Sequence, residues 1–347
     1  MLMKAMFRPL LPTIAFATLL VGCSSCGKPP ADSTGGGAVS LSGEIKVDGS
    51  STVFPVSQAI AEEFMKANPG ANVSVGESGT SAGFQKFLDG AIDVADASRP
   101  IDDKEAATAK EKGIEFVEIP IAYDGLTICV NNKNTWCDTL TVKELNEIWK
   151  PESKINNWKD VRPGFPDKPL KLFGAGEASG TYDYFNQAIN GNKKLTRSDF
   201  QKSEDDNMTV TGVSDEEGGM GYFGFSFFEQ NSSKLKAIKV DPGTGPVGPS
   251  EATINDGTYQ PLSRPLFIYI NKKSLAEKPA LKAWVAFMLS SDGQALIKST
   301  GIVTLPAEAY DLGKARAEAM TAGSIFAGKN IVGIKIADIL KAESASK

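Results

Sequence analysis

The sequence FGAGEASGTYDYF, from Phe173 to Phe185, joins a short apolar run to an aromatic-rich segment of helical character through a series of small residues. The run from Pro169 to Phe173 predicts a strand and the aromatic segment a helix, so a tight turn connects them. Ser179, Gly180 and Thr181 then fall in the first helical turn, where backbone N–H groups lack partners and the helix dipole adds positive charge. Such a turn suits an anion, although helix capping by Ser179 or Thr181 explains the same residues.

Two further stretches have the same construction. In the first, a strand pattern from Glu44 to Asp48 runs through GSSTVFP (Gly49 to Pro55) into a helical pattern from Val56 to Ala67. In the second, the strand Asn72 to Val75 runs through GESGTSAG into a helix that opens at Phe84. Capping alone does not explain three turns of this kind, so the repetition favours an anion site.

A fourth element, DVADASRP from Asp93 to Pro100, predicts a short strand that ends in a turn. Alternation places Asp96 and Ser98 on one side of the strand and Arg99 on the other, until the turn redirects the chain. An arginine at a strand end can hold two oxygens of a tetrahedral oxyanion. An exposed surface arginine is the competing interpretation, and the neighbouring hydroxyl-rich turns favour the first.

Composition excludes several classes of function. The chain has 347 residues, of which 41% are hydrophobic and 23% charged, which suits two globular domains. Its formal charge of −5 disfavours binding to nucleic acid. The absence of histidine excludes a Ser-His-Asp triad, a Cys-His pair and histidine metal sites. We therefore expect neither a metal site nor a cofactor, and most hydrolase mechanisms are excluded.

Residues 1–22 have the pattern of a bacterial signal peptide, with Lys4 and Arg8 before an apolar run that is short for a membrane span. The LVGC tetrad that ends at Cys23 resembles a lipobox, which implies cleavage before Cys23, lipidation of that cysteine and export. A secreted soluble protein with a chance cysteine is the alternative. Residues 23–42 are small, polar and glycine-rich towards their end, and predict a flexible tether.

The remaining cysteines leave two interpretations open. Cys129 and Cys137 flank a predicted strand end and turn, so either a local disulfide or two buried thiols would suit them. Cys26 lies in the tether, and no CxxC pair indicates a zinc site.

The rest of the chain alternates strands and helices, as an α/β protein does. Strands are predicted at Ile114 to Ala122, at Leu126 to Val130 and at Pro265 to Ile270. Thr141, followed by Glu144 three residues later, predicts a capped helix that runs to Trp149. Further predicted elements are an aromatic core segment and two helices: Gly218 to Phe228, Ala280 to Met288 and Gly293 to Ser299.

The motifs GSSTVFPVSQAIAEEF, ESGTSAGFQKF, DVADASRPI and GEASGTYDYF, in this order and spacing, resemble the PstS-type phosphate-binding proteins of bacterial ABC importers. The resemblance extends from about Gly43 to Lys347 and is to the branch with a Ser-Arg pair in its third motif along the chain. It implies a type II periplasmic-binding-protein fold, in which two α/β lobes are joined by two crossing segments with a ligand cleft between them. The implied first lobe comprises 43–123 and 265–347, and the second comprises 124–264.

The resemblance also implies a function and a ligand set. It implies a lipid-anchored monomer in the periplasm or on the outer face of a bacterial membrane, which binds inorganic phosphate and delivers it to an ABC permease. Another branch has an aspartate where Ser98 stands and an arginine near Ala175, so the sequence departs from that pattern. The implied ligands are Ser51, Thr52 and the Val53 amide, Thr80, Ser81, Ser98, Arg99, Ser179, Gly180 and Thr181.

Selectivity for phosphate requires more than these donors. Phosphate near neutral pH keeps a P–O–H proton and sulfate does not, so a buried carboxylate that accepts this proton favours phosphate. Asp96, Asp183 and Asp206 are the candidates, and we favour Asp206 slightly because it lies at the start of a predicted helix in the second lobe. The alternatives are pairing with Arg99 for Asp96, a helix-dipole contact for Asp183 and an N-cap for Asp206.

Two competing functions remain. One is a binding protein for another oxyanion, such as sulfate, molybdate or tungstate, and a cleft without a carboxylate would favour it. The other is a phosphatase with Ser51 or Ser179 as nucleophile, which would lack a histidine base and a recognisable metal cluster.

Overall fold

The structure of the protein is a computed structural model that describes residues 41–192, 194–326 and 341–342. The predicted signal peptide 1–22, Cys23 and nearly all of the tether 23–42 lie outside the described residues. Within the described ranges, no helix is long and apolar enough to cross a membrane.

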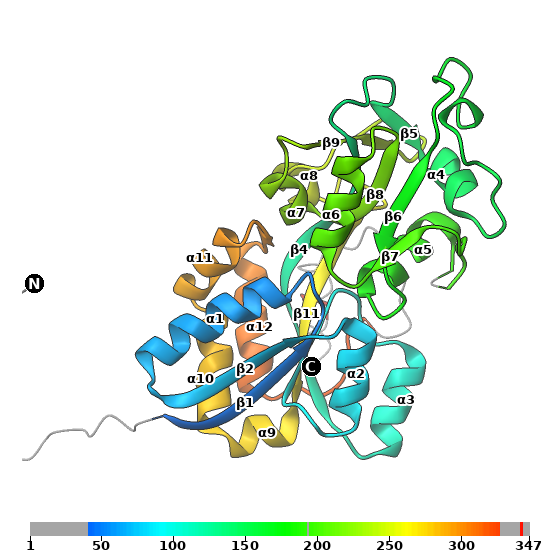
Figure 1. Ribbon diagram of the computed structural model, residues 1–347. Coiled ribbons are helices and arrows are strands. Elements are labelled where there is room, and N and C mark those ends of the chain that lie inside the picture. Colours follow the sequence, from blue (N-terminus) through cyan, green and yellow to red (C-terminus); the bar gives the residue numbers. More distant parts are fainter. Residues whose placement is uncertain (1–40, 193, 327–340, 343–347) are drawn as a thin grey trace, which may run out of the picture. The chain divides into compact units, whose positions relative to one another are not determined.

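The first three strands form a parallel sheet with helices between them (Figure 1). The elements are β1 (Ser42–Gly49), α1 (Phe54–Ala67), β2 (Gly70–Glu77), α2 (Thr80–Leu88), β3 (Val94–Ala97) and α3 (Asp103–Glu111). Because β1 pairs in parallel with β2 and β3, the carboxyl ends of all three strands lie at one edge. One expectation was wrong: α2 begins at Thr80 and not at Phe84, since the chain turns at Gly79, which has a φ of 88°.

Two strands connect this sheet to the second part of the chain: β4 (Phe116–Asn131) and β11 (Ser263–Asn271). β11 pairs with β3 and with β4 as far as Gly125, and from Leu126 onward β4 pairs with β8 instead. β4 is therefore continuous where the sequence predicted two strands, because its partner changes without a break in its buried backbone. The predicted crossing at Asp124-Gly125 coincides with this change of partner.

The second part of the chain extends the sheet from β4 through β8 and β6 to β7. β6 is parallel to both of its neighbours. Thr141 and Glu144 form the predicted capping box of α4. The elements are β5 (Thr139–Thr141), α4 (Val142–Trp149), a 3-10 helix (Trp158–Asp160), β6 (Lys171–Ala175), α5 (Gly180–Asn190), β7 (Gln201–Ser203), α6 (Asp206–Asp215), β8 (Gly219–Gly224), α7 (Phe225–Gln230), β9 (Leu235–Ala237), β10 (Lys239–Asp241) and α8 (Glu251–Asn255).

An aromatic cluster forms part of the core in this second region. The Phe185 and Tyr222 rings stack with centroids 3.9 Å apart, and Trp149 packs edge-on against both. Tyr222 belongs to the segment Gly218 to Phe228, which supplies core side chains as expected.

After β11 the chain returns to the first sheet. The elements are α9 (Lys272–Glu277), α10 (Pro279–Met288), α11 (Ser291–Ser299), β12 (Val303–Thr304) and α12 (Ala307–Glu318). β12 pairs with β4 at Tyr123 and Ala122, and α10 packs against β1 and α1. β4 and β11 thus provide the two crossings that the lobe boundaries 43–123, 124–264 and 265–347 require, and those boundaries stay a prediction.

The structure contains the two buried thiols and not the disulfide. Cys129 lies within β4, and the Cys137 amide donates to Asn134 Oδ1 at 3.0 Å. Both cysteines are free and buried. Burial raises the pKa of the Cys137 thiol to about 12 and also raises that of Cys129.

Candidate anion-binding site

The turns that follow β1, β2 and β3 meet at the carboxyl edge of the first sheet. The Gly79 amide donates to the Gly49 carbonyl at 2.7 Å, which joins the first turn to the second. Thr80 Oγ1 lies 3.2 Å from Ser98 Oγ and accepts from the Ser98 amide at 3.2 Å, which joins the second to the third. Hydroxyl groups from three separate segments are therefore neighbours.

The turn between β6 and α5 meets these three from the opposite side. Thr181 Oγ1 lies 3.4 Å from Thr52 Oγ1. Gly180 packs so closely that an added Cβ would lie 2.4 Å from Ser98 Oγ and 2.6 Å from Thr80 Oγ1, so a side chain does not fit there. Ser179 also caps α5, because its hydroxyl accepts from the Thr181 amide at 3.1 Å.

The cluster is buried but not saturated with hydrogen bonds. Its hydroxyl-bearing residues Ser51, Thr52, Thr80, Ser98, Ser179 and Thr181 are each at most 3% exposed. Among the described residues, four backbone amides of the cluster form no backbone hydrogen bond, those of Ser51, Thr52, Thr80 and Gly180. The Val53 amide, in contrast, already donates to the Ser50 carbonyl at 3.1 Å. Buried donors without acceptors cost free energy, so the cluster favours a ligand with several acceptor oxygens.

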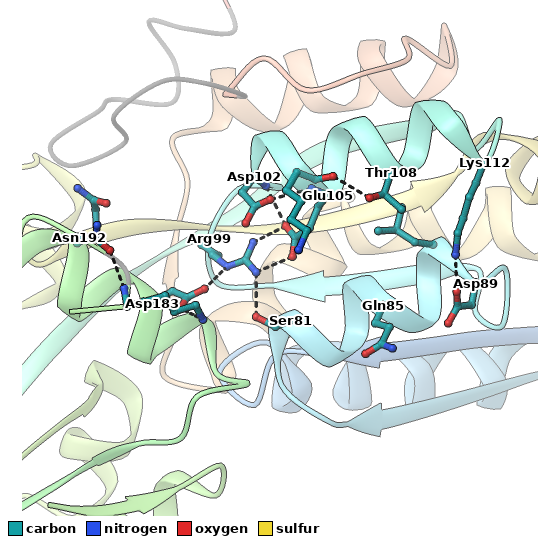
Figure 2. A pocket seen from close by; sticks show the side chains of 14 residues that line it. Ser81, Gln85, Asp89, Arg99, Asp102, Glu105, Thr108, Lys112, Asp183 and Asn192 are labelled. Atoms are coloured by element: carbon teal, nitrogen blue, oxygen red, sulfur yellow. Dashed lines mark hydrogen bonds and ion pairs between the residues drawn. The ribbon is translucent and has the colours of Figure 1, made fainter. Parts of the chain in front are cut away.

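Arg99 is buried beside this cluster, but its guanidinium is directed to other groups. Nε donates to Asp183 at 2.9 Å, and Nη1 and Nη2 hold both oxygens of Glu105 at 2.8 Å (Figure 2). Nη1 also donates to the Pro100 carbonyl and Nη2 to Ser81 Oγ, each at 3.0 Å. All five N–H groups of Arg99 therefore have protein acceptors, which the prediction that Arg99 holds two oxygens of an oxyanion did not anticipate.

Arg99 and the side chains that accept from it line a cavity of about 760 Å³. Ser81 on α2, Glu105 on α3 and Asp183 on α5 line it together with Arg99 (Figure 2). Its lining mixes acidic, basic and amide side chains and does not include Thr52 or Thr181. The cavity and the hydroxyl cluster are thus neighbouring but separate features.

Arg264, which the sequence analysis missed, lies within the hydroxyl cluster. This side chain is fully buried, and its Nη2 donates to Thr52 Oγ1 at 3.2 Å and to Thr181 Oγ1 at 2.9 Å. Nε and Nη2 also hold Asp124 Oδ2 at 3.1 and 2.8 Å, because β11 pairs with β4 in a register that sets Arg264 opposite Asp124. A signal was present: Ser263-Arg264-Pro265 repeats the tripeptide Ser98-Arg99-Pro100.

The three candidate acceptors have different surroundings. Asp183 accepts from Arg99 and, at 2.8 Å, from Lys194 Nζ, so both of its oxygens are occupied. Asp206 begins α6, where Asp205 is the N-cap residue. The Oδ2 atom of Asp206 is buried and has no hydrogen-bond partner among the described residues. Both oxygens of Asp96 on β3 are likewise buried and unpartnered within that part of the chain.

Burial changes the protonation of two of these carboxyl groups. It raises the pKa of Asp206 to about 7, with the positive charge of Arg264 opposing the shift. It raises the pKa of Asp96 to about 8, and there the nearby charge is Asp48 instead of Arg264. Asp206 is therefore the candidate within the field of the buried cation. No cluster of acidic or cysteine side chains with the geometry of a metal site occurs in the described ranges.

Comparison with known proteins shows the family to which this chain belongs. The family model described as "PBP superfamily domain" matches residues 31–292. The protein SphX of Synechococcus elongatus is 47% identical over 302 residues, which cover 86% of this chain and 88% of the relative. The phosphate-binding protein PstS of Staphylococcus saprophyticus is 40% identical over 295 residues, covering 85% and 88%.

Two solved structures are similar to this chain over most of its length. A possible phosphate-binding protein of Planctomyces limnophilus has 48% identity and a TM-score of 0.64, covering 81% of this chain and all of that one. An ABC-type phosphate transport receptor of Vibrio cholerae has 26% identity and a TM-score of 0.61, covering 75% and 99%. The fold is thus the two-lobed α/β architecture of periplasmic binding proteins. Within that class, the chain belongs to the family of the SphX and PstS proteins.

Proposed function

We propose that the protein binds inorganic phosphate outside the cytoplasm and delivers it to an ABC-type permease. The observation that carries this proposal is the convergence of four hydroxyl-bearing turns, with unpartnered buried amides, around one buried guanidinium. A tetrahedral oxyanion supplies enough acceptors for such a set of donors. The PstS relative is named a phosphate-binding protein and the Vibrio cholerae structure a phosphate transport receptor, which supports phosphate and transport.

The proposed ligands come from all four turns. Hydroxyl and amide groups at the helix N-termini surround the oxyanion, and the helix dipoles add partial positive charge. The proposed set is Ser51, Thr52, Thr80, Ser81, Ser98, Ser179, Gly180 and Thr181. The Val53 amide would join it only by giving up its hydrogen bond to the Ser50 carbonyl.

Asp206 is the proposed acceptor of the phosphate proton. Its unpartnered oxygen can accept the P–O–H of phosphate once it is ionised, whereas sulfate would meet it as a like charge. Asp183 lacks an unoccupied oxygen for this role. Asp96 has unpartnered oxygens, but Arg264 is not among the charges that act on it.

Isothermal titration of protein stripped of bound ligand tests the proposal. We expect saturable binding of phosphate at one site and binding of sulfate weaker on the order of tenfold or more, roughly the contribution of one charged hydrogen bond. Equal or tighter binding of sulfate, molybdate or tungstate would transfer the function to that oxyanion. Hydrolysis of a phosphate ester by the purified protein would instead favour the phosphatase alternative, for which the chain has no histidine.

Anchoring and partners complete the proposal. Lipidation at Cys23 would hold the monomeric protein at the outer face of a membrane, where closure of its lobes presents a bound conformation to the permease. Metabolic labelling with palmitate should mark the parent protein and not Cys23→Ser. Labelling of the variant, or none of the parent, would refute the anchor.

A further inference from the structure

We propose that Arg264, held in place by Asp124, is the cation that binds the oxyanion, and that Arg99 has no direct contact with it. This inference rests on the proposed function, because it assigns a role within the same site. The sequence pointed to Arg99 through the motif that carries it, whereas the structure sets a second Ser-Arg-Pro arginine among the predicted ligands.

Hydrogen-bonding capacity separates the two arginines. Every N–H group of Arg99 has an acceptor at 3.0 Å or less. On Arg264, Nε and Nη2 are held by Asp124 and the two threonines, but the contact of Nη1 is a long one of 3.4 Å to the Ser98 carbonyl. A guanidinium nitrogen carries two N–H groups, so Nη1 retains capacity for a ligand oxygen.

The ion pairs of the two arginines also favour Arg264 as the residue that binds the anion. Arg99 lies between two carboxylates, Glu105 and Asp183, the second of which it shares with Lys194, so its charge is already neutralised. Arg264 has an ion pair with one carboxylate, Asp124, and both partners are fully buried. A dianion brought into a buried site is favoured next to a cation that forms an ion pair with one carboxylate and not with two.

Arg264 also fixes which way its neighbouring hydroxyls donate. The oxygens of Thr52 and Thr181 both accept from its Nη2, at 3.2 and 2.9 Å. A threonine oxygen that accepts from a guanidinium keeps its own O–H for another acceptor. The arginine therefore takes neither hydroxyl proton, and at least one of them remains for the ligand when the two hydroxyls contact each other at 3.4 Å, in addition to its own Nη1.

The position of Arg264 in the fold explains how one side chain can serve both lobes. It lies on β11, one of the two crossing strands, while Thr52 follows β1 and Thr181 lies on α5. Its carboxylate partner is fixed in turn, since Asp124 Oδ1 accepts from the Phe225 amide at 3.1 Å. Asp124 is thus a positioning residue and Arg264 the group that touches the ligand.

The test compares four variants in titrations with inorganic phosphate. Arg264→Met combined with Asp124→Asn removes the cation without leaving a buried charge unpaired, and Asp124→Asn alone retains the cation. Arg99→Met examines the competing arginine. Arg197→Met is the matched control, because Arg197 is also buried and fully bonded but lies among Asp199, Ile148 and Ile155. Thermal unfolding checks that each variant is folded.

We expect the double variant to bind phosphate on the order of a hundredfold more weakly than Asp124→Asn, as for the loss of charged hydrogen bonds. Arg99→Met should lose less than about tenfold, and Arg197→Met should bind as the parent does. A double variant within about tenfold of Asp124→Asn, or an equal loss in Arg99→Met, would overturn the assignment. A parent that binds no phosphate would contradict the proposed function instead, and the same variants titrated with sulfate and molybdate would then decide the role of Arg264.

Discussion

At the scale of single residues, the buried carboxyl group of Asp206 is the proposed acceptor that would distinguish this cluster from a set of donors alone. The other polar groups that converge there are hydroxyls, amides and a guanidinium whose carboxylate partner, Asp124, is occupied by it, so sulfate satisfies these donors as well as phosphate does. Because burial raises the pKa of Asp206 to about 7, this group is largely protonated below that pH and ionised above it. The selectivity of the site should therefore depend on pH.

We expect the phosphate-to-sulfate preference of the parent to increase as the pH rises through about 7, since only ionised Asp206 repels sulfate. Asp206→Asn should show a smaller preference, with only the pH dependence that comes from the second ionisation of phosphate itself. Isothermal titration with both anions between roughly pH 5.5 and 8.5 measures it, and spans both protonation states. If the variant keeps the preference and pH profile of the parent, Asp206 is not the acceptor.

The raised pKa of Asp206 also predicts how the stability of the ligand-free protein depends on pH. The folded state retains a proton on Asp206 between its ordinary pKa of 3.8 and its folded value of about 7, while the unfolded state has lost it. The free energy of unfolding must then fall as the pH rises across this interval, and the fall ends above it. Asp206→Asn should remove this part of the decrease in denaturant titrations. Asp96 gives a similar decrease up to about pH 8, so Asp96→Asn is the control that separates the two groups.

The residues themselves show what sequence can and cannot predict here. The hydroxyls of Thr52, Thr80, Ser98 and Thr181 were identified because each follows a strand and precedes or ends a turn, which is a local pattern. Arg264 was missed because its role depends on the register of β11 against β4, which lies about 140 residues away in the chain. Local patterns do not carry such long-range pairings.

At the scale of elements, the contact between α5 and the end of β3 joins the two lobes beside the site. Asp183 on α5 holds Arg99, which is in turn fixed by Glu105 of the α3 capping box. The Ser81 amide of α2 also donates to the Ala178 carbonyl before α5, at 3.0 Å. The sequence predicted α5 and its cap at Ser179, but it did not predict α3 with its capping box and left open what Asp183 does.

Asp183→Asn should weaken this contact while Glu105 continues to hold Arg99. Since lobe closure traps the ligand, we expect the dissociation rate of phosphate to rise on the order of tenfold with little change in the association rate. Stopped-flow measurements test it. Lys194→Met is the control, because Lys194 is 62% exposed and its ion pair with Asp183 contributes little. A loss of phosphate-to-sulfate selectivity in Asp183→Asn, with unchanged dissociation, would make Asp183 the acceptor instead.

At the scale of the whole molecule, β4 and β11 connect the two lobes and also position residues of the site. β4 and β11 pair along the crossing, and this pairing brings Asp124 and Arg264 to the place where the four turns meet. The alternation of strands and helices was predictable because apolar periodicity is local. The continuity of β4 was not, because it depends on partners from distant parts of the chain.

A crystal structure of the protein with phosphate tests this account most directly. We expect a phosphate within hydrogen-bond distance of the hydroxyls of Thr52, Thr80, Ser98 and Thr181. Nη1 of Arg264 should donate to one phosphate oxygen, and the Asp206 carboxylate should accept the phosphate proton. Phosphate bound instead in the cavity beside Arg99 and Glu105, with no contact to Arg264, would contradict it.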